Sequence, residues 1–330
     1  MTRLDDKLAR ILAGRYRPSD FIIADAKDGD MGPSLTSCGP HRAADGSWTR
    51  TRTRAEFLDQ IRAIVRQDIL DVMLVSASNV EVLSREGLFR DSQVKPAIRA
   101  NDTTDIWVMR GATYVRSPSR PFRTADLARV KPYTDLGLYS VTFNNNIDAD
   151  IASLEAFAAF RADAAANDFT YFLEVFNPNV ESGIAADVLP HYVNDCIARC
   201  LAAVVQADRP RFLKIAYNGP KALEELASFD PGLIVGVLGG GAGTTRDTFE
   251  LLAQAERYGA RVALFGRKIN LAESPLTIVA LMREVASRNL TPDAAVRAYH
   301  AELSRQGIKP TRALDDDNRI TEAVLKQAAA

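Results

Sequence analysis

The sequence is poor in the residues that build disulfide or metal frameworks. Its 330 residues include only three cysteines, three histidines and two tryptophans. No two cysteines form a CxxC pair, and an odd number without a framework is typical of a reducing compartment. Cys196 and Cys200 lie four residues apart in an apolar helical pattern, which predicts buried thiols rather than zinc ligands. The scattered histidines, His41, His191 and His300, argue against a zinc site built on several histidines.

Long apolar runs and an excess of one charge are also missing. The sequence contains no stretch of eighteen apolar residues, so we expect no membrane span. The segment "MTRLDDKLARIL" lacks the apolar segment of a signal peptide. The formal net charge is −1, which gives no bias towards nucleic acid or anionic membranes. The basic stretch "RTRTR" is not interleaved with aromatic residues as nucleic-acid sites often are. We therefore expect a cytoplasmic protein, in a homo-oligomer, that binds neither nucleic acid nor membrane.

What the sequence has in abundance is alternation between apolar runs and amphipathic helical patterns. Each apolar run looks buried on both faces, as the strands of a helix-covered parallel sheet are. The eight candidate strands cover residues 20–26, 69–77, 105–110, 136–144, 169–177, 211–219, 232–240 and 260–266.

Eight strands alternating with helices favour a closed (β/α)8 TIM barrel over an open sheet. We expect one domain over residues 1–330, with the barrel at about 20–285. One further helix precedes the first strand at about 2–14, and a helical extension follows the barrel at about 286–330. The third crossover, about 111–135, is rich in proline and arginine and has the weakest helical pattern.

A lysine interrupts the sixth candidate strand, "RFLKIAYNG". Burying an unpaired ammonium is costly, so Lys214 needs a reason to be there. Burial beside other cations can leave a lysine neutral, and a neutral amine can attack a carbonyl to form an imine. The alternative is a structural ion pair with Glu174 on the neighbouring strand. Active sites of such barrels lie at the C-terminal strand ends, where Asp25, Arg110 and Asn144 are also expected.

Two glycine-containing loops follow the last two candidate strands. "LGGGAGTTRDTF" places Gly239, Gly240 and Gly241 before a helix whose first turn would offer free N–H groups. "FGRKIN" supplies Gly266 and Arg267 after the final strand. Loops in these two positions commonly hold phosphate in barrel enzymes, although glycines also serve simply to turn the chain tightly.

Over about residues 211–285 the sequence resembles the DeoC/LacD superfamily of class I aldolases, which includes archaeal-type fructose-bisphosphate and tagatose-bisphosphate aldolases. Members carry a lysine near the end of strand 6, a glycine pair after strand 7, and "GRNI" with an acidic-Pro element after strand 8. Here Lys214, the glycines from Gly239 and "GRKIN…ESP" take those places, and "FLEVF" matches the strand 5 glutamate of the tagatose type. Two positions depart from the family pattern. Ala26 stands where the family has a histidine after the first-strand aspartate, and Phe143 stands where the archaeal type has a strand 4 tyrosine.

The resemblance implies a class I aldolase that acts on a phosphorylated sugar or a related anionic carbonyl compound, without metal or other cofactor. Lys214 would form the Schiff base, and Glu174 or Asp25 would move the proton. Gly239, Gly240, Gly241, Gly266, Arg267, Arg110 and Asn144 would bind substrate or phosphate. Two alternatives stay open: a sugar-phosphate isomerase or binding barrel without an imine, and a transaldolase- or thiolase-like carbon transfer that uses the same lysine.

Two arginine-rich segments flank the expected site. They could bind a second phosphate, a carboxylate or a sulfonate, or they could form a solvated face or a subunit contact. Their arginines are Arg42, Arg50, Arg52 and Arg54 after strand 1, and Arg110, Arg116, Arg120 and Arg123 after the third strand.

Overall fold

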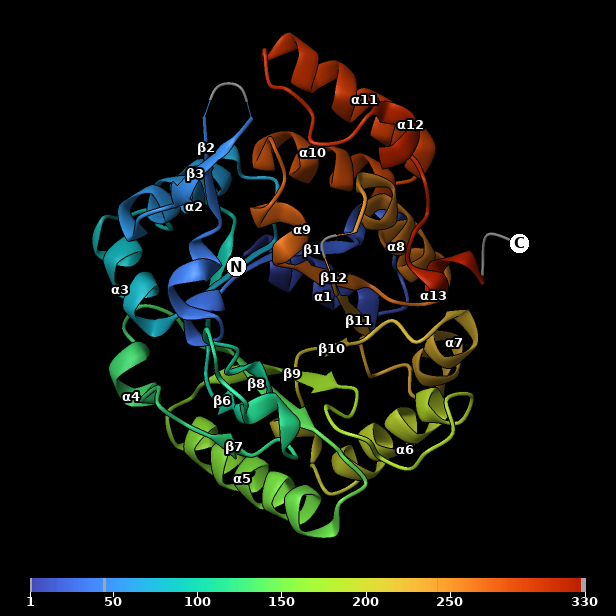
Figure 1. The fold of residues 1–330 in the computed structure, drawn as a ribbon. Coiled ribbons are helices and arrows are strands. Elements are labelled where there is room, and N and C mark those ends of the chain that lie inside the picture. The colour runs from blue at the N-terminus through green and yellow to red at the C-terminus, as the bar shows by residue number, and fades with distance from the viewer. Residues whose placement is uncertain (1, 44–45, 242, 328–330) are drawn as a thin grey trace.

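The barrel predicted from the sequence is present. The computed structural model describes residues 2–43, 46–241 and 243–327. Eight parallel strands close on themselves, and helices surround them in a ring (Figure 1). The strands follow one another around the barrel as β1 (Ile22–Lys27), β4 (Val72–Val75), β5 (Lys95–Arg99), β8 (Leu136–Thr142), β9 (Thr170–Phe176), β10 (Leu213–Ile215), β11 (Gly236–Leu238) and β12 (Val262–Phe265), which pairs again with β1.

Helices connect successive strands on the outside of the barrel. Several begin with the expected signals, such as the Thr244–Asp247 capping box and proline in the first turn at Pro275 and Pro292. The helices between strands are α2 (Arg54–Gln67), α3 (Ala77–Arg85), α4 (Leu127–Val130), α5 (Ile147–Ala166), α6 (Leu189–Leu201), α7 (Pro220–Phe229) and α8 (Thr245–Arg257). After β12 come α9 (Arg267–Asn270), α10 (Pro275–Ala286), α11 (Pro292–Arg305), α12 (Leu314–Asp317) and α13 (Ala323–Lys326). Among the described residues, no helix is both long enough and apolar enough to cross a bilayer.

Side chains of each strand alternate between the barrel interior and the helix layer. One apolar cluster fills the interior, and on β1 it takes Ile22 and Ala24. A second, larger cluster fills the space between strands and helices, and it takes Ile23 from the same strand. This alternation decides which polar residues near the C-terminal strand ends can reach a substrate.

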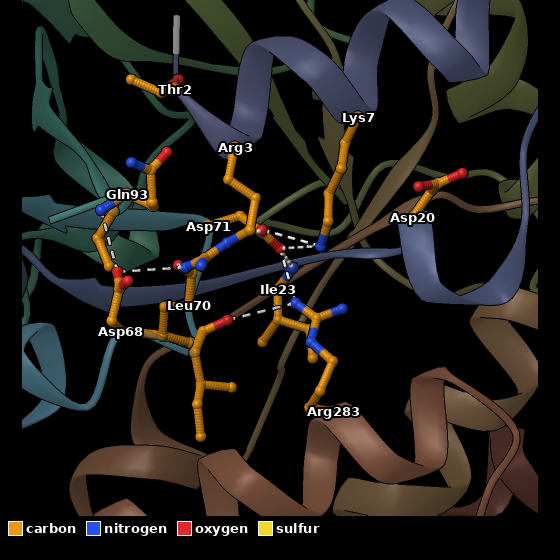
Figure 2. Close-up of polar contacts among 12 residues, drawn as sticks. Thr2, Arg3, Lys7, Asp20, Ile23, Asp68, Leu70, Asp71, Gln93 and Arg283 are labelled. Carbon is orange, nitrogen blue, oxygen red and sulfur yellow. Dashed lines mark hydrogen bonds and ion pairs between the residues drawn. The ribbon is translucent and has the colours of Figure 1, made fainter.

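The helix α1 (Arg3–Leu12) closes the N-terminal end of the barrel, as Leu4 and Leu8 join the interior cluster. Figure 2 shows the ionic contacts that hold it there, centred on the fully buried Asp71. Its carboxylate pairs with Lys7 at 2.8 Å, with Arg3 of the same helix at 3.0 Å, and with Arg283 of α10 at 2.8 Å. The end of the barrel away from the expected site is therefore sealed by structural contacts.

The position predicted for the third strand is wrong. The expected strand at 105–110 is wrong: Thr104–Ile106 forms a short 3-10 helix, and the strand is β5, at Lys95–Arg99. "KPAIR" was missed because its lysine, proline and arginine leave only two apolar residues, and proline is uncommon in central strands. The aromatic residue that suggested a strand, Trp107, packs edge-on against Tyr114 and Phe122. These residues belong to the long connection over residues 104–123, which we call the loop subdomain. The weak helix expected in this crossover is the four-residue α4.

The C-terminal extension returns to the mouth of the barrel. The two helical patterns after the last strand, "PLTIVALMREVASRN" (275–289) and "TPDAAVRAYHAELSRQG" (291–307), form α10 and α11. Beyond them the chain crosses over α8 in Figure 1, and α13 lies beside it. Asp247 of α8 accepts hydrogen bonds from the backbone of Thr321 and Glu322, and Glu322 pairs with Lys268 at 3.0 Å. The extension thus braces the loops after β11 and β12.

Candidate active site

Lys214 and Glu174 face each other inside the barrel. They are register partners on the neighbouring strands β10 and β9, and Lys214 Nζ lies 2.5 Å from Glu174 Oε1. Two residues earlier in the chain, Phe212 just before β10 and Phe172 on β9 stack with ring centroids 4.6 Å apart. Because alternate residues of a strand share a face, this aromatic pair packs directly below the ionic pair in the apolar interior of the barrel. Both charged side chains are buried, with 6% of Lys214 and 1% of Glu174 exposed.

The second oxygen of Glu174 is held from the other side. Glu174 Oε2 accepts hydrogen bonds from Arg99 at 3.1 Å and from Ser140 Oγ at 2.6 Å. Arg99 ends β5, donates to Ser140 Oγ at 2.8 Å, and pairs through Nε with Asp28 Oδ2 at 2.5 Å. Four buried charges therefore form a chain across the barrel, from Asp28 through Arg99 and Glu174 to Lys214.

The electrostatics of this chain keep the Asp28–Arg99 pair charged. Burial alone would raise the pKa of Asp28, but the charges of Arg99 and Lys214 and the hydrogen bond from Arg99 lower it below its ordinary value. Burial opposes the charge of Arg99 too, yet Asp28 and Glu174 raise its pKa above the ordinary value. Arg99 is thus a fixed cation that orients both carboxylates.

These groups open into a pocket of about 390 Å³ at the C-terminal ends of the strands. Lys214, Glu174, Arg99 and Asp28 all line it. This is the end of the barrel at which TIM-barrel enzymes carry their active sites.

The glycine loops form one corner of the same pocket. Gly239, Gly240, Gly266 and Arg267 line it, and Gly240 has a left-handed backbone with φ of 61°. A Cβ at Gly266 would lie 2.9 Å from the carbonyl oxygen of Ala26, so glycine allows a close backbone approach there. Arg267 is exposed and has no hydrogen-bond or ion-pair partner among the described residues. A cation beside glycine backbone at this position suits a phosphate group.

The start of α8 does not offer the free N–H groups expected from the sequence. Thr245 N donates to Asp317 Oδ1 at 2.9 Å, and Asp247 N donates to Thr244 Oγ1 at 3.0 Å. The C-terminal extension and the capping box therefore already use these donors. The cationic part of the corner comes from Arg267 rather than from the helix.

Four of the expected site residues lie away from the pocket. Asp25 is in register with Met73 and Phe265, which belong to the cluster outside the barrel wall, so its side chain points away from the interior. Arg110 is exposed on the loop subdomain because the strand expected to carry it is absent. Asn144 is buried and accepts a hydrogen bond from Asn179 N at 3.0 Å, which fixes a neighbouring loop, and Gly241 is exposed outside the pocket lining.

Asp25 instead forms a fully buried pair with Lys27 on the same strand. Lys27 Nζ lies 3.3 Å from Asp25 Oδ2, and the carboxylate oxygens of Asp25 accept no hydrogen bond from the described residues. Burial raises the pKa of Asp25 to about 6, although the charge of Lys27 opposes the rise. Burial likewise lowers the pKa of Lys27, which lines the edge of the pocket.

Sequence reasoning missed Asp28, Arg99 and Ser140. Asp28 follows Ile22, Ala24 and Ala26 in the inward alternation, so counting by two from the interior residues would have favoured it over Asp25. Ser140 could be found in the same way from Leu136 and Leu138. Arg99 had no such signal, because its strand was not recognised.

Most arginines of the segment after β1 serve internal contacts. Arg50 pairs with Glu56, Arg52 donates to the carbonyl of Cys38, and Arg54 donates to Asn79. Arg42 donates to Thr311 in the C-terminal extension. These contacts hold the segment against its own chain, which neither the anion-binding nor the solvated-face interpretation predicted.

Solved structures similar to this one include several aldolases. No protein-family model matches the sequence, and no curated protein matches it. A Schiff-base-forming fructose-1,6-bisphosphate aldolase superimposes with a TM-score of 0.63 at 15% identity, covering 86% of this chain and 99% of that chain. An archaeal fructose 1,6-bisphosphate aldolase gives 0.60 at 15% identity over 86% and 99% of the two chains. The fructose-bisphosphate aldolase from Slackia heliotrinireducens gives 0.63 at 11% identity over 91% and 90%.

The fold is shared. Identities this low show the common barrel architecture, and any activity must be argued from the site itself.

Proposed function

We propose that this protein is a class I aldolase that makes or breaks a carbon–carbon bond in a phosphorylated carbonyl compound through a Schiff base on Lys214. The contact between Lys214 Nζ and Glu174 Oε1 carries the proposal, because it places a lysine and a proton acceptor together in a pocket. The glycine corner with Arg267 supports a phosphorylated substrate. The similarity in fold to aldolases, one described as Schiff-base forming, agrees with this chemistry.

In the proposed mechanism, Lys214 first gives its proton to Glu174. The free amine adds to the substrate carbonyl, and the carbonyl oxygen receives one proton from the attacking nitrogen and one from Glu174. It leaves as water, so that an iminium and the Glu174 carboxylate remain. Arg99 and Ser140 hold the far oxygen of Glu174 during this transfer, so the oxygen facing Lys214 stays in place.

Bond cleavage then uses the iminium as the electron acceptor. Glu174 takes the proton of the hydroxyl on the carbon beyond the scissile bond, a carbonyl product leaves, and the electron pair of the bond forms an enamine. Protonation of the enamine carbon and hydrolysis of the imine release the second product and restore the amine. The reverse sequence makes the bond.

Reductive trapping tests the proposal. Borohydride added with a phosphorylated ketose or aldehyde should leave a stable adduct on Lys214, detected as a mass shift of its peptide. Absence of an adduct, with the sugar phosphate still bound, would indicate the alternative of a binding or isomerase barrel in which the Lys214–Glu174 pair is structural.

A transaldolase-like enzyme would form the same adduct. A donor–acceptor screen separates the two reactions, because an aldolase releases both products from the donor alone. A transferase releases the second fragment only when an acceptor is supplied.

A further inference from the structure

The walls of the pocket differ in charge, and this difference selects among phosphorylated substrates. We propose that the pocket takes a substrate with a single phosphate, held at the glycine corner, and an uncharged far end. This inference rests on the proposed function for the position of the phosphate and extends it to the substrate class.

The wall opposite the glycine corner comes from other strands. In the closed order of the barrel, β11 and β12 lie across from β5 and β8. On that side the pocket is lined by Ile106 and Val108, from the segment after β5, and by Phe176 at the end of β9. The charged groups there are Arg99 at the end of β5, which is already paired with Asp28 and Glu174, and the carboxylate of Asp105.

This far wall is held in place by specific contacts. Asp105 Oδ1 accepts a hydrogen bond from Ser119 at 3.0 Å, and Oδ2 accepts one from Thr142 of β8 at 2.6 Å. Beside Ile106, the ring of Trp107 lies 4.7 Å from that of Phe122 and 5.4 Å from that of Tyr114. The segment is thus anchored both to a barrel strand and to its own aromatic cluster.

Three of the cations that line the pocket are paired with carboxylates, and the fourth lies at the glycine corner. Lys214 and Arg99 pair with Glu174, Lys27 pairs with Asp25 on β1 beside β12, and Arg267 stands at the glycine corner. A phosphate at the far wall would face apolar side chains, the carboxylate of Asp105, and Arg99, whose charge is already balanced by Asp28 and Glu174. Desolvating a dianion there without a partner is costly, and the nearby carboxylate repels it.

The arginines of the loop subdomain add no cation to the far wall of the pocket. Arg110, Arg116 and Arg120 are exposed and none of them lines the pocket, while Arg123 pairs with Asp163 of α5. Their density in the sequence suggested a second anion site, but their side chains lie outside this cavity.

Binding of unreactive polyols tests the inference apart from the chemistry. Glucitol 6-phosphate and glucitol 1,6-bisphosphate have no carbonyl, so neither can form an imine with Lys214. Titration calorimetry on the full chain should give dissociation constants within about threefold of each other, because one charge-assisted contact would otherwise contribute about tenfold or more. A bisphosphate that binds tenfold tighter overturns the proposal, whether or not Lys214 can be trapped.

Two variants sharpen the test. Val108→Arg places a cation on the far wall at a side chain that is 46% exposed. It should tighten binding of the bisphosphate about tenfold and leave the monophosphate unchanged, whereas the uncharged control Val108→Met should change neither. Arg267→Ala should weaken the binding of both polyol phosphates to the same extent. If Arg267→Ala affects neither ligand, the phosphate does not sit at the glycine corner and the inference fails.

Discussion

Lys214 Nζ and Glu174 Oε1 lie 2.5 Å apart on adjacent barrel strands, and Arg99 and Ser140 hold the opposite oxygen of Glu174. This relationship makes Glu174 the nearest proton acceptor for the lysine. It also separates two roles within one carboxylate, since one oxygen is anchored and the other is free to exchange a proton. The first prediction concerns that exchange.

Glu174→Gln should keep imine formation measurable but slow bond cleavage. General acid–base catalysis is worth roughly 10²–10⁴ in rate, so single-turnover cleavage should fall by about that factor. Asp25→Asn is the matched control, because Asp25 points into the helix layer and should retain near-normal turnover per folded molecule. A nearly normal Glu174→Gln together with an inactive Asp25→Asn would reverse the assignment.

Arg99 should act by positioning Glu174 rather than by touching the substrate. Arg99→Lys keeps one charge but loses the planar fork that reaches Asp28, Ser140 and Glu174 together. We expect kcat to fall by about tenfold or more, with KM changed less than threefold, because the substrate-binding corner is untouched. A rise in KM as large as the fall in kcat would instead indicate a merely structural role.

Arg267 should bind the phosphate of the substrate. Replacing it with alanine should raise KM for a phosphorylated substrate about tenfold or more, as a charge-assisted contact contributes roughly 1.5–3 kcal/mol. KM for the corresponding unphosphorylated sugar should stay the same. Lys268→Met is not a suitable control because Lys268 is buried against Glu322, so Arg110→Ala, on the exposed loop subdomain, is the better one.

The Asp71 cluster should govern stability without affecting the chemistry. Asp71→Asn leaves Lys7, Arg3 and Arg283 without their carboxylate, and breaking a buried ionic contact of this kind costs about 3–5 kcal/mol. Asp68→Asn is the control, because Asp68 lies 3.5 Å from Arg3 with 40% of its side chain exposed, and such pairs contribute about 0–1 kcal/mol. Urea unfolding of the three proteins measures the difference.

The same cluster predicts a dependence of stability on pH. Burial alone would raise the pKa of Asp71, but Lys7 and Arg283 hold it below its ordinary value. A carboxyl group whose pKa is lower in the folded state than in the unfolded state stabilises the fold fully at pH values above its unfolded pKa, which is near 4. That stabilisation is lost as the pH falls through the folded pKa. The gap in unfolding free energy between wild type and Asp71→Asn should therefore narrow below about pH 4. A constant gap from pH 7 to pH 3 would contradict the assignment.

Much of this architecture can be predicted because apolar runs and helix signals recur along the chain. Seven strands overlap their expected ranges, and the helices α1, α10 and α11 lie where the amphipathic patterns place them. Lys214 and Glu174 could be found because each interrupts an apolar strand with a charge, and a buried charge needs a function or a partner. β5 could not, because its sequence carries more polar and proline character than apolar residues, and its burial comes only from closure of the barrel.

The face of each side chain was harder to predict than the element that carries it. Asp25 and Asp28 are both at the end of the first strand, and the choice between them depends on a strand register that only pairing with β4 and β12 fixes. Likewise, the free N–H groups expected at α8 are occupied by Asp317, which is far away in the sequence and reaches α8 only through the C-terminal extension. The cytoplasmic location and the homo-oligomeric state stay predictions.

The decisive variants are those of Lys214 itself. Lys214→Arg should abolish both the borohydride-trapped adduct and the activity, because a guanidinium stays protonated and cannot add to a carbonyl. The fold should survive this change, since an arginine can still pair with Glu174 above the stacked Phe172 and Phe212. Lys214→Met removes the pair altogether and leaves Glu174 to Arg99 and Ser140, so a comparison of the two thermal unfolding curves isolates the structural contribution of the ion pair. Activity that withstands Lys214→Arg, or an adduct on Lys27 or another lysine, would remove the mechanism proposed for this pocket.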